Sequence, residues 1–230
     1  DCDDYWCNPG KLEAQVSYLE AHPDCAMTVH AAAVKNDRGE LVNRNLMRPY
    51  RGDRDLSPAE LVDKAGSFPF GAMLLRREVV ENLPDWYFRC PVGDRPLELL
   101  AALKGYCHYA DRFDSVYRFH GAGSWTEEMK SGDFKKKQDR YALAMRELYR
   151  AFDRESGGRY HRAAVSAARR VYFLTRVNLR DYDEIFSPRY RRYYRELSLR
   201  DRCFIRAEQT LPSLFSGLRR LRDRIFRQEG

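Results

Sequence analysis

The distribution of charge divides this chain into two parts with different folding patterns. Residues 1–129 carry 15 Lys and Arg against 21 Asp and Glu, a net charge of −6, whereas residues 130–230 carry 26 against 13, a net charge of +13. The first part alternates strand-like apolar runs with helical patterns, and the second part has helical patterns only. We therefore predict an α/β domain over residues 1–126 and a basic α-helical region over residues 127–230. An acidic first part suits a metal site, and a basic second part suggests an anionic partner.

Composition excludes several other classes of protein. The 230 residues are 43% hydrophobic and 13% aromatic, which is enough for a packed core. No run reaches the roughly eighteen apolar residues that cross a bilayer, and no signal-peptide pattern opens the chain. The six cysteines form no C-x-x-C pairs, so they indicate neither a zinc module nor a small disulfide scaffold. We expect reduced thiols in a cytoplasmic protein that is soluble or peripheral to the inner face of the membrane.

The chain opens on a cluster of carboxylates followed by two aromatic residues, Asp1-Cys2-Asp3-Asp4-Tyr5-Trp6. Carboxylates this close repel one another unless a cation lies between them. In an extended segment Asp1 and Asp3 point to one side and Asp4 to the other. That spacing suits Mg²⁺ or Mn²⁺ bound by few carboxylates, with positions left for water and phosphate oxygens. A solvated acidic segment, with Asp4 capping a turn, is the simpler alternative.

A second candidate site follows about ninety residues later, in the run Pro91-Val92-Gly93-Asp94-Arg95-Pro96-Leu97. Asp94 follows a glycine and precedes a helix that we expect to begin near Arg95. The N-terminus of a helix favours an ionised carboxylate, which a catalytic base requires, although a simple N-cap is the commoner use of such an aspartate. The aromatic cluster just before it, Trp86-Tyr87-Phe88, is either core or a platform on which an acceptor stacks.

A third motif, Tyr117-Arg118-Phe119-His120-Gly121-Ala122-Gly123-Ser124-Trp125, reads as the end of a strand followed by a glycine-rich turn. Alternation along the strand places Arg118 and His120 on the same side. A cation and an imidazole side by side suit a phosphate or a metal, whereas a strand end with a surface turn is the structural alternative.

In this order, the motifs D-x-D-D-Y-W, P-x-K-L-x-x-Q-V-x-x-L-E (residues 9–20), G-D-x-P-L and Y-R-x-H-x-x-G-x-W resemble those of the family 2 glycosyltransferases of the GT-A fold. The resemblance covers residues 1–126 and implies the C-terminal half of a Rossmann-like GT-A domain, followed by the α-helical region. Because the aspartate motif lies in mid-domain in that family, we expect this chain to be the C-terminal part of a longer transferase whose nucleotide-binding half is missing. The segment 123–126 is one residue longer than commoner forms, which leaves the role of Trp125 open.

The resemblance also implies an inverting reaction and assigns roles to particular residues. Asp94 is the implied catalytic base. The implied binding residues are, for the nucleotide sugar, Asp1, Asp3 and Arg118; for the metal, Asp3 and His120; and for the acceptor, Trp86, Gly93 and Trp125. The implied cofactor is Mn²⁺ or Mg²⁺, the donor a UDP- or dTDP-linked sugar, and the acceptor a glycan or a lipid-linked molecule, with no nucleic acid expected.

Two other functions fit the same residues. The basic helices could form a binding module for an anionic membrane or nucleic acid, or the aspartates could serve another divalent-metal phosphotransferase. The sequence between Leu211 and Phe226 predicts an amphipathic basic helix, which either contacts a membrane through residues 211–227 or packs on its own domain.

Local patterns predict the elements that carry these motifs. The predicted features are a helix capped by Asn8 and started by Pro9, a strand over 25–34 containing His30, a mobile loop over 44–55, a capping box at Ser57–Glu60, a buried strand over 71–75, and helices from Asp133 onward, including one around Tyr190–Leu197.

Overall fold

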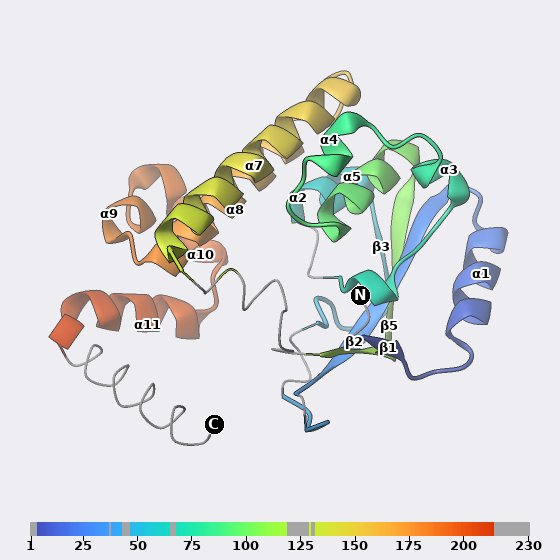
Figure 1. Ribbon diagram of the computed structural model, residues 1–230, viewed down its shortest axis with the longest axis horizontal. Coiled ribbons are helices and arrows are strands. Elements are labelled where there is room, and N and C mark those ends of the chain that lie inside the picture. Colours follow the sequence, from blue (N-terminus) through green and yellow to red (C-terminus); the bar gives the residue numbers. More distant parts are fainter. Residues whose placement is uncertain are drawn as a thin grey trace. The chain divides into compact units, whose positions relative to one another are not determined.

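The computed structural model describes residues 4–36, 38–42, 47–64, 68–118, 129 and 132–213. The chain divides into two compact units, residues 1–171 and 172–230, and each is considered by itself. The first unit is a curled mixed sheet with helices, and the described elements of the second unit are helices (Figure 1). The α/β class followed by a helical region is therefore confirmed, while the domain boundary at residue 126 stays a prediction.

The sheet of the first unit is organised around two long parallel strands, β2 (Cys25–Lys35) and β5 (Tyr106–Arg118). Three short strands pair antiparallel to them: β1 (Tyr5–Trp6) with the end of β5, β3 (Arg54–Leu56) with its beginning, and β4 (Leu74–Leu75) with β2. Gly105 allows β5 to start beside β2, because a Cβ at that position would lie 2.1 Å from the Asp24 carbonyl oxygen. The pairing of β1 with β5 brings the first and third motifs of the sequence to the same end of the sheet.

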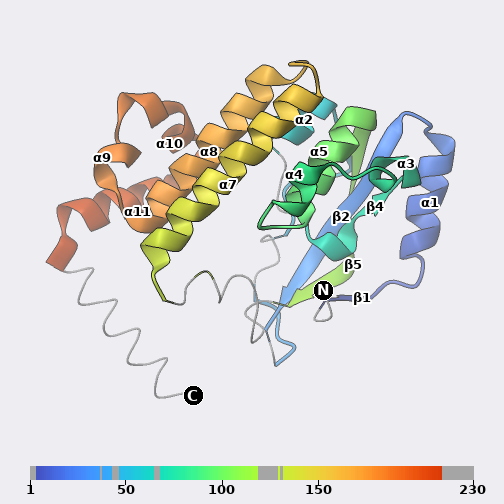
Figure 2. The same cartoon turned by 45° about the horizontal axis from the view of Figure 1, so that its top comes forward.

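Helices cover both faces of these strands (Figure 2). One face carries α1 (Lys11–Ala21), and the other carries α2 (Pro58–Lys64) and α5 (Asp94–Lys104). The core under α2 and α5 also includes residues of α7 (Phe134–Glu155), among them the fully buried Phe152. Burial on both faces explains why β2 reads as a nearly continuous apolar run rather than an alternating one.

Short elements complete the first unit: the 3₁₀ turn η1 (Phe70–Ala72), α3 (Arg77–Val80) and α4 (Asp85–Phe88). The chain then passes through α8 (His161–Leu179) into the second unit, which contains α9 (Tyr182–Ile185), η2 (Pro188–Tyr190), α10 (Arg191–Glu196) and α11 (Leu199–Thr210). A separate core there consists of Phe173, Ile185, Tyr190, Tyr193 and Ile205. Across the described stretches of both units, no helix is long and apolar enough to pass through a membrane.

Two local predictions are confirmed in detail. The strand predicted over 25–34 is β2, and His30 is buried within it. The capping box is formed, since the Ser57 N–H donates to Glu60 Oε2 at 3.0 Å and the Glu60 N–H donates to Ser57 Oγ at 3.4 Å. The five cysteines within the described ranges form no disulfide with one another.

The start of α1 was predicted wrongly. Gly10, rather than Asn8, occupies the N-cap position, and Lys11 is the first helical residue. Asn8 still acts locally, because its Oδ1 accepts a hydrogen bond from the Gly10 N–H at 3.0 Å. An Asx turn therefore precedes the helix and delays its beginning by two residues.

Three further predictions are corrected. The segment 71–75 is a 3₁₀ turn followed by the two-residue strand β4, instead of one buried strand. The loop predicted over 44–55 ends earlier, because Arg54 and Asp55 belong to β3. The helix predicted around Tyr190–Leu197 is split into η2 and α10, and α11 follows it without having been predicted. Most of the basic helix predicted over 211–226 lies outside the described residues.

The segment before β3 is attached to the sheet through Asp111. Its carboxylate accepts hydrogen bonds from Arg48 Nε at 2.6 Å, from Arg48 Nη2 at 2.5 Å and from the Gly52 N–H at 2.7 Å. The Arg48 guanidinium lowers the pKa of Asp111 to about 2. Since this pKa lies below the value of 3.8 for an unperturbed Asp, the stabilisation is fully present above about pH 4 and is lost as the pH falls through 2.

We therefore expect Asp111→Asn to lower the free energy of unfolding at neutral pH and to flatten its decrease between pH 4 and pH 2. Urea unfolding at a series of pH values measures both effects. A variant that loses as much stability in this interval as the wild type does would contradict the assignment.

Candidate functional site

A cavity of about 340 Å³ lies where β1, η1 and the end of β5 meet. It is lined by Asp4, Tyr5, Trp6, Phe70, Gly71, Met73 and Ser115. Three of these side chains are aromatic and partly exposed, namely Tyr5, Trp6 and Phe70. The aromatic side chains can stack on an apolar ring face of a ligand. The neighbouring carboxylate and hydroxyl can accept hydrogen bonds from the polar edge of the same ligand.

Hydrogen bonds from two other elements fix η1, which forms one wall of the cavity. Trp6 Nε1 donates to the Gly71 carbonyl oxygen at 2.9 Å. Gln15 Nε2, on α1, donates to the Ala72 carbonyl oxygen at 3.0 Å and to Thr28 Oγ1 on β2 at 3.1 Å. The wall is therefore tied to β1, α1 and β2 at once.

Lys11 lies buried behind the aromatic wall. Its Nζ donates to Gln15 Oε1 at 2.7 Å and lies 4.2 Å from the centroid of the Trp6 ring. Burial lowers the pKa of Lys11, although the nearby Asp114 carboxylate acts in the opposite direction. This cation–π contact helps to hold the Trp6 ring, which lines the cavity.

The first and third sequence motifs are joined at this site. The Arg118 N–H donates a hydrogen bond to Asp4 Oδ1 at 3.0 Å, across 114 positions of sequence. Asp4 immediately follows Asp3, and Arg118 is two residues before His120, so the described ends of both motifs are in contact. Asp1, Asp3, His120 and Trp125 themselves lie outside the described residues.

The second motif reaches the cavity through Phe70. A Cβ at Gly93 would lie 3.9 Å from Phe70 Cε2, so the N-terminus of α5 is next to the cavity wall. Asp94 is the first residue of α5, and its Oδ1 accepts a hydrogen bond from the Arg95 N–H at 2.7 Å. The helix predicted to follow Gly93 is confirmed, and its start carries the carboxylate.

Trp86 is placed differently from Gly93. It is partly buried against the core of the first unit, and its Nε1 is buried without a hydrogen-bond partner in the described part of the chain. Phe88, two residues later, is 71% exposed. Within this cluster, Phe88 presents the larger free aromatic surface.

His30 lies in the core of the sheet rather than at the cavity. Its Nδ1 donates to the Ala31 carbonyl oxygen at 2.8 Å, and burial lowers the pKa of the imidazole. His30 is therefore a core residue of the sheet and does not line the cavity.

The oxygen donors at the cavity are of the kind that a hard divalent cation prefers. The described candidates are the Asp4 carboxylate and the Ser115 hydroxyl. No group of three or more His, Cys, Asp or Glu side chains among the described residues could hold a metal ion. The described residues thus offer two oxygen donors of the type that Mn²⁺ or Mg²⁺ accepts, and they form no complete metal site by themselves.

Comparisons with known proteins give distant and partial similarity. No family model matches the chain. A segment of 129 residues is 28% identical to the uncharacterized protein Rv1520 of Mycobacterium tuberculosis and to the uncharacterized protein Mb1547 of Mycobacterium bovis. The match covers 54% of this chain and 34% of each relative, so it spans about a third of the length of those proteins.

Lys11, Gln15 and Phe70 were not predicted as parts of the site. The first two belong to the P-x-K-L-x-x-Q-V motif and are four residues apart on one face of α1. In α1 this polar face is buried, while Leu12 and Val16 are 41% and 42% exposed. A polar pair at helical spacing in front of a predicted strand was the available signal.

Proposed function

We propose that this chain carries the metal-binding, acceptor-binding and catalytic part of an inverting, nucleotide-sugar-dependent glycosyltransferase of family 2. The observation that supports the proposal most directly is the hydrogen bond between Asp4 and Arg118. It joins the acidic motif at one end of the chain to the Tyr-Arg motif more than a hundred residues later. The contact between Phe70 and the position of Gly93 relates the second motif to the same cavity.

In the proposed reaction Asp94 accepts the proton of the acceptor hydroxyl. The acceptor oxygen forms a bond with the anomeric carbon of the sugar while the bond from that carbon to the diphosphate breaks, so the nucleoside diphosphate leaves. Arg118 faces the diphosphate, and Asp1 and Asp3 bind the nucleotide sugar. Asp3 and His120 would hold a divalent cation, which would neutralise the charge that develops on the leaving group.

The acceptor is held in this proposal by Gly93, Trp86 and Trp125. Tyr5, Trp6 and Phe70 add a stacking surface at the cavity that the motifs alone did not include. Gly93 leaves room for the acceptor to approach the start of α5, because it has no side chain of its own.

The metal assignment is tested by donor binding. In the full-length protein, we expect Asp3→Ala to weaken Mn²⁺-dependent binding of a UDP- or dTDP-sugar at least about tenfold. Calorimetric titrations with and without Mn²⁺ measure the effect. Nucleoside triphosphates titrated in parallel separate this proposal from another phosphotransferase.

Asp24→Ala is the matched control, because Asp24 is an exposed aspartate outside the cavity. It should bind the donor as the wild type does. Equal donor affinity of the wild type with and without the divalent ion would contradict the metal assignment.

A further inference from the structure

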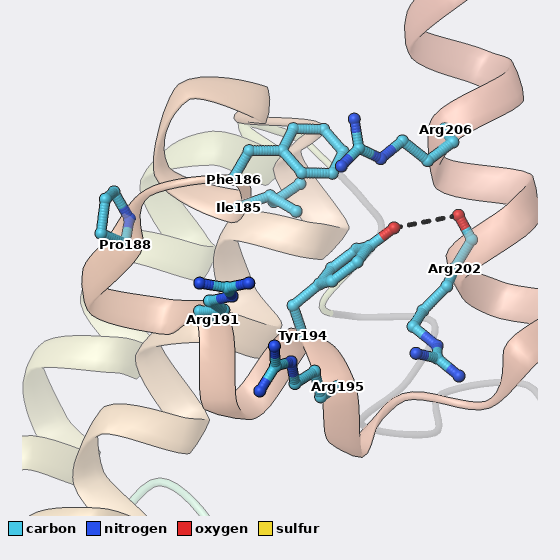
Figure 3. Close-up of a pocket in the computed structure, with 8 residues that line it drawn as sticks. All are labelled: Ile185, Phe186, Pro188, Arg191, Tyr194, Arg195, Arg202 and Arg206. Atoms are coloured by element: carbon cyan, nitrogen blue, oxygen red, sulfur yellow. Dashed lines mark hydrogen bonds between the residues drawn. The ribbon is translucent and has the colours of Figure 1, made fainter.

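The second unit contains a cavity of about 470 Å³ that the proposed transfer reaction does not use. It is lined by Ile185, Phe186, Pro188, Arg191, Tyr194, Arg195, Arg202 and Arg206. Half of these residues are arginines, and none is acidic. Figure 3 shows Arg191 and Arg195 coming from α10, on one side, and Arg202 and Arg206 coming from α11, on the other.

The four arginines form two pairs with a spacing of four residues. Residues at this spacing lie on the same face of a helix, where like charges destabilise each other. Among the residues that the structure describes, none of these guanidinium groups has a carboxylate within 4.0 Å. The cavity therefore concentrates positive charge that is not neutralised locally.

The carboxylates of the two helices are engaged elsewhere. Glu196 pairs with Arg192 at 3.3 Å, and Glu208 pairs with Arg180 at 2.7 Å. The Asp201 carboxylate accepts a hydrogen bond from the hydroxyl of Ser198, the N-cap of α11, at 2.6 Å. Glu196 and Glu208 neutralise other arginines, and Asp201 binds a hydroxyl, so the arginines of the cavity remain available to an incoming anion.

Aromatic rings support the basic groups instead. The Arg206 guanidinium lies 4.2 Å from the centroid of the Phe186 ring, and the Tyr194 ring packs edge-on against Phe186 at 5.3 Å. Tyr194 Oη donates to the Arg202 carbonyl oxygen at 3.2 Å, which ties α10 to α11 (Figure 3). Arg202 Nε is buried without a hydrogen-bond partner in the described structure, so part of this cation is desolvated without compensation.

From this arrangement we propose that the cavity binds a phosphate group. The planar fork of a guanidinium matches two phosphate oxygens, and several arginines in one cavity suit a monoester or diphosphate with more than one negative charge. Ile185, Pro188 and Phe186 give the cavity an apolar side that can contact the group to which the phosphate is attached. The phosphate belongs either to a soluble compound or to a lipid headgroup. This site does not depend on the proposed glycosyltransferase activity.

The test compares the wild-type chain with Arg191→Gln/Arg195→Gln. Calorimetric titration with inorganic pyrophosphate examines the soluble source. Sedimentation with vesicles examines the lipid source. The vesicles consist of phosphatidylcholine with either phosphatidic acid or, at matched surface charge, phosphatidylserine. We expect the variant to bind pyrophosphate or phosphatidic acid about tenfold more weakly. Tighter binding to phosphatidic acid vesicles than to pyrophosphate assigns the lipid headgroup, and the reverse assigns a soluble phosphate.

Arg162→Gln/Arg169→Gln is the matched control, since it removes the same charge from two exposed positions of α8 outside the cavity. It should bind like the wild type. Arg202→Gln/Arg206→Gln tests the other helix independently, and thermal unfolding verifies that each variant is folded. Absence of binding by the wild type, or equal losses in the cavity variants and the control, would overturn the proposal.

Discussion

Asp94→Asn should leave donor binding almost unchanged and reduce transfer by about 10² to 10⁴-fold, the range expected for loss of a general base. The substitution keeps the size of the side chain and an oxygen that accepts from the Arg95 N–H, the contact that Asp94 Oδ1 makes at 2.7 Å. It removes the ability to take up the acceptor proton. Chemistry should therefore fail while the start of α5 is preserved.

The measurement is release of nucleoside diphosphate from a panel of UDP- and dTDP-sugars, with a cell extract as the source of acceptors. The full-length protein is used again. Asp85→Asn provides the control, because Asp85 is also the first residue of a helix, α4, and its side chain is 89% exposed. Near wild-type turnover in Asp94→Asn would show that another group serves as the base.

Local signals in the sequence were sufficient for several elements of the fold. The capping box at Ser57 and Glu60 was predictable because its hydrogen bonds connect residues three positions apart. The strand from Cys25 was predictable because an apolar run between two turn signals has few other interpretations. The start of α5 after Gly93 followed from the same kind of local evidence.

The features that could not be predicted from the sequence depend on contacts between residues far apart in the chain. The register of β1 on β5 pairs Tyr5 with Val116, and no local pattern specifies that pairing. The buried face of α1 contains Lys11 and Gln15 beside Leu19, and Gln15 is accommodated there by partners on η1 and β2. A rule that places Leu12 and Val16 inside therefore fails. The segment 71–75 becomes a 3₁₀ turn where Trp6, sixty-five positions away, binds the Gly71 carbonyl oxygen.

The candidate site shows the same division. The motifs identified Asp94 and Arg118 as residues of interest. The structure adds that Arg118 binds Asp4, and that Gly93, next to Asp94, lies near Phe70; Asp4 and Phe70 line one cavity. Phe70 carried no sequence signal, since its role comes from the approach of Gly93 to its ring. The cluster of arginines in the second unit was visible only as an excess of basic charge.

Arg95→Met should produce the largest loss of stability, about 3 to 5 kcal/mol, because it leaves a buried carboxylate without its cation. Arg95 connects three helices: its Nη1 donates to the Leu61 carbonyl oxygen of α2 at 2.9 Å, and its Nε donates to Tyr149 Oη of α7 at 2.8 Å. Within α5 it forms an ion pair with Glu98, and the two side chains are only 12% and 4% exposed. The substitution removes all of these interactions from the first turn of α5, the turn that carries Asp94.

The pH dependence of this loss identifies its cause. Burial raises the pKa of Glu98 to about 7, and the Arg95 guanidinium counteracts that rise. Without Arg95 the pKa of Glu98 in the folded protein increases further above the ordinary value of 4.5. The variant therefore goes on losing stability at pH values where the wild type no longer does. Urea unfolding should therefore show a difference in the free energy of unfolding between wild type and Arg95→Met that is nearly constant below about pH 7 and widens above it. Adding Glu98→Gln should remove the widening and recover about 1 kcal/mol or more, because the buried charge is gone. A gap that is constant with pH, or a double variant as unstable as the single one, would mean that Arg95 acts through packing alone.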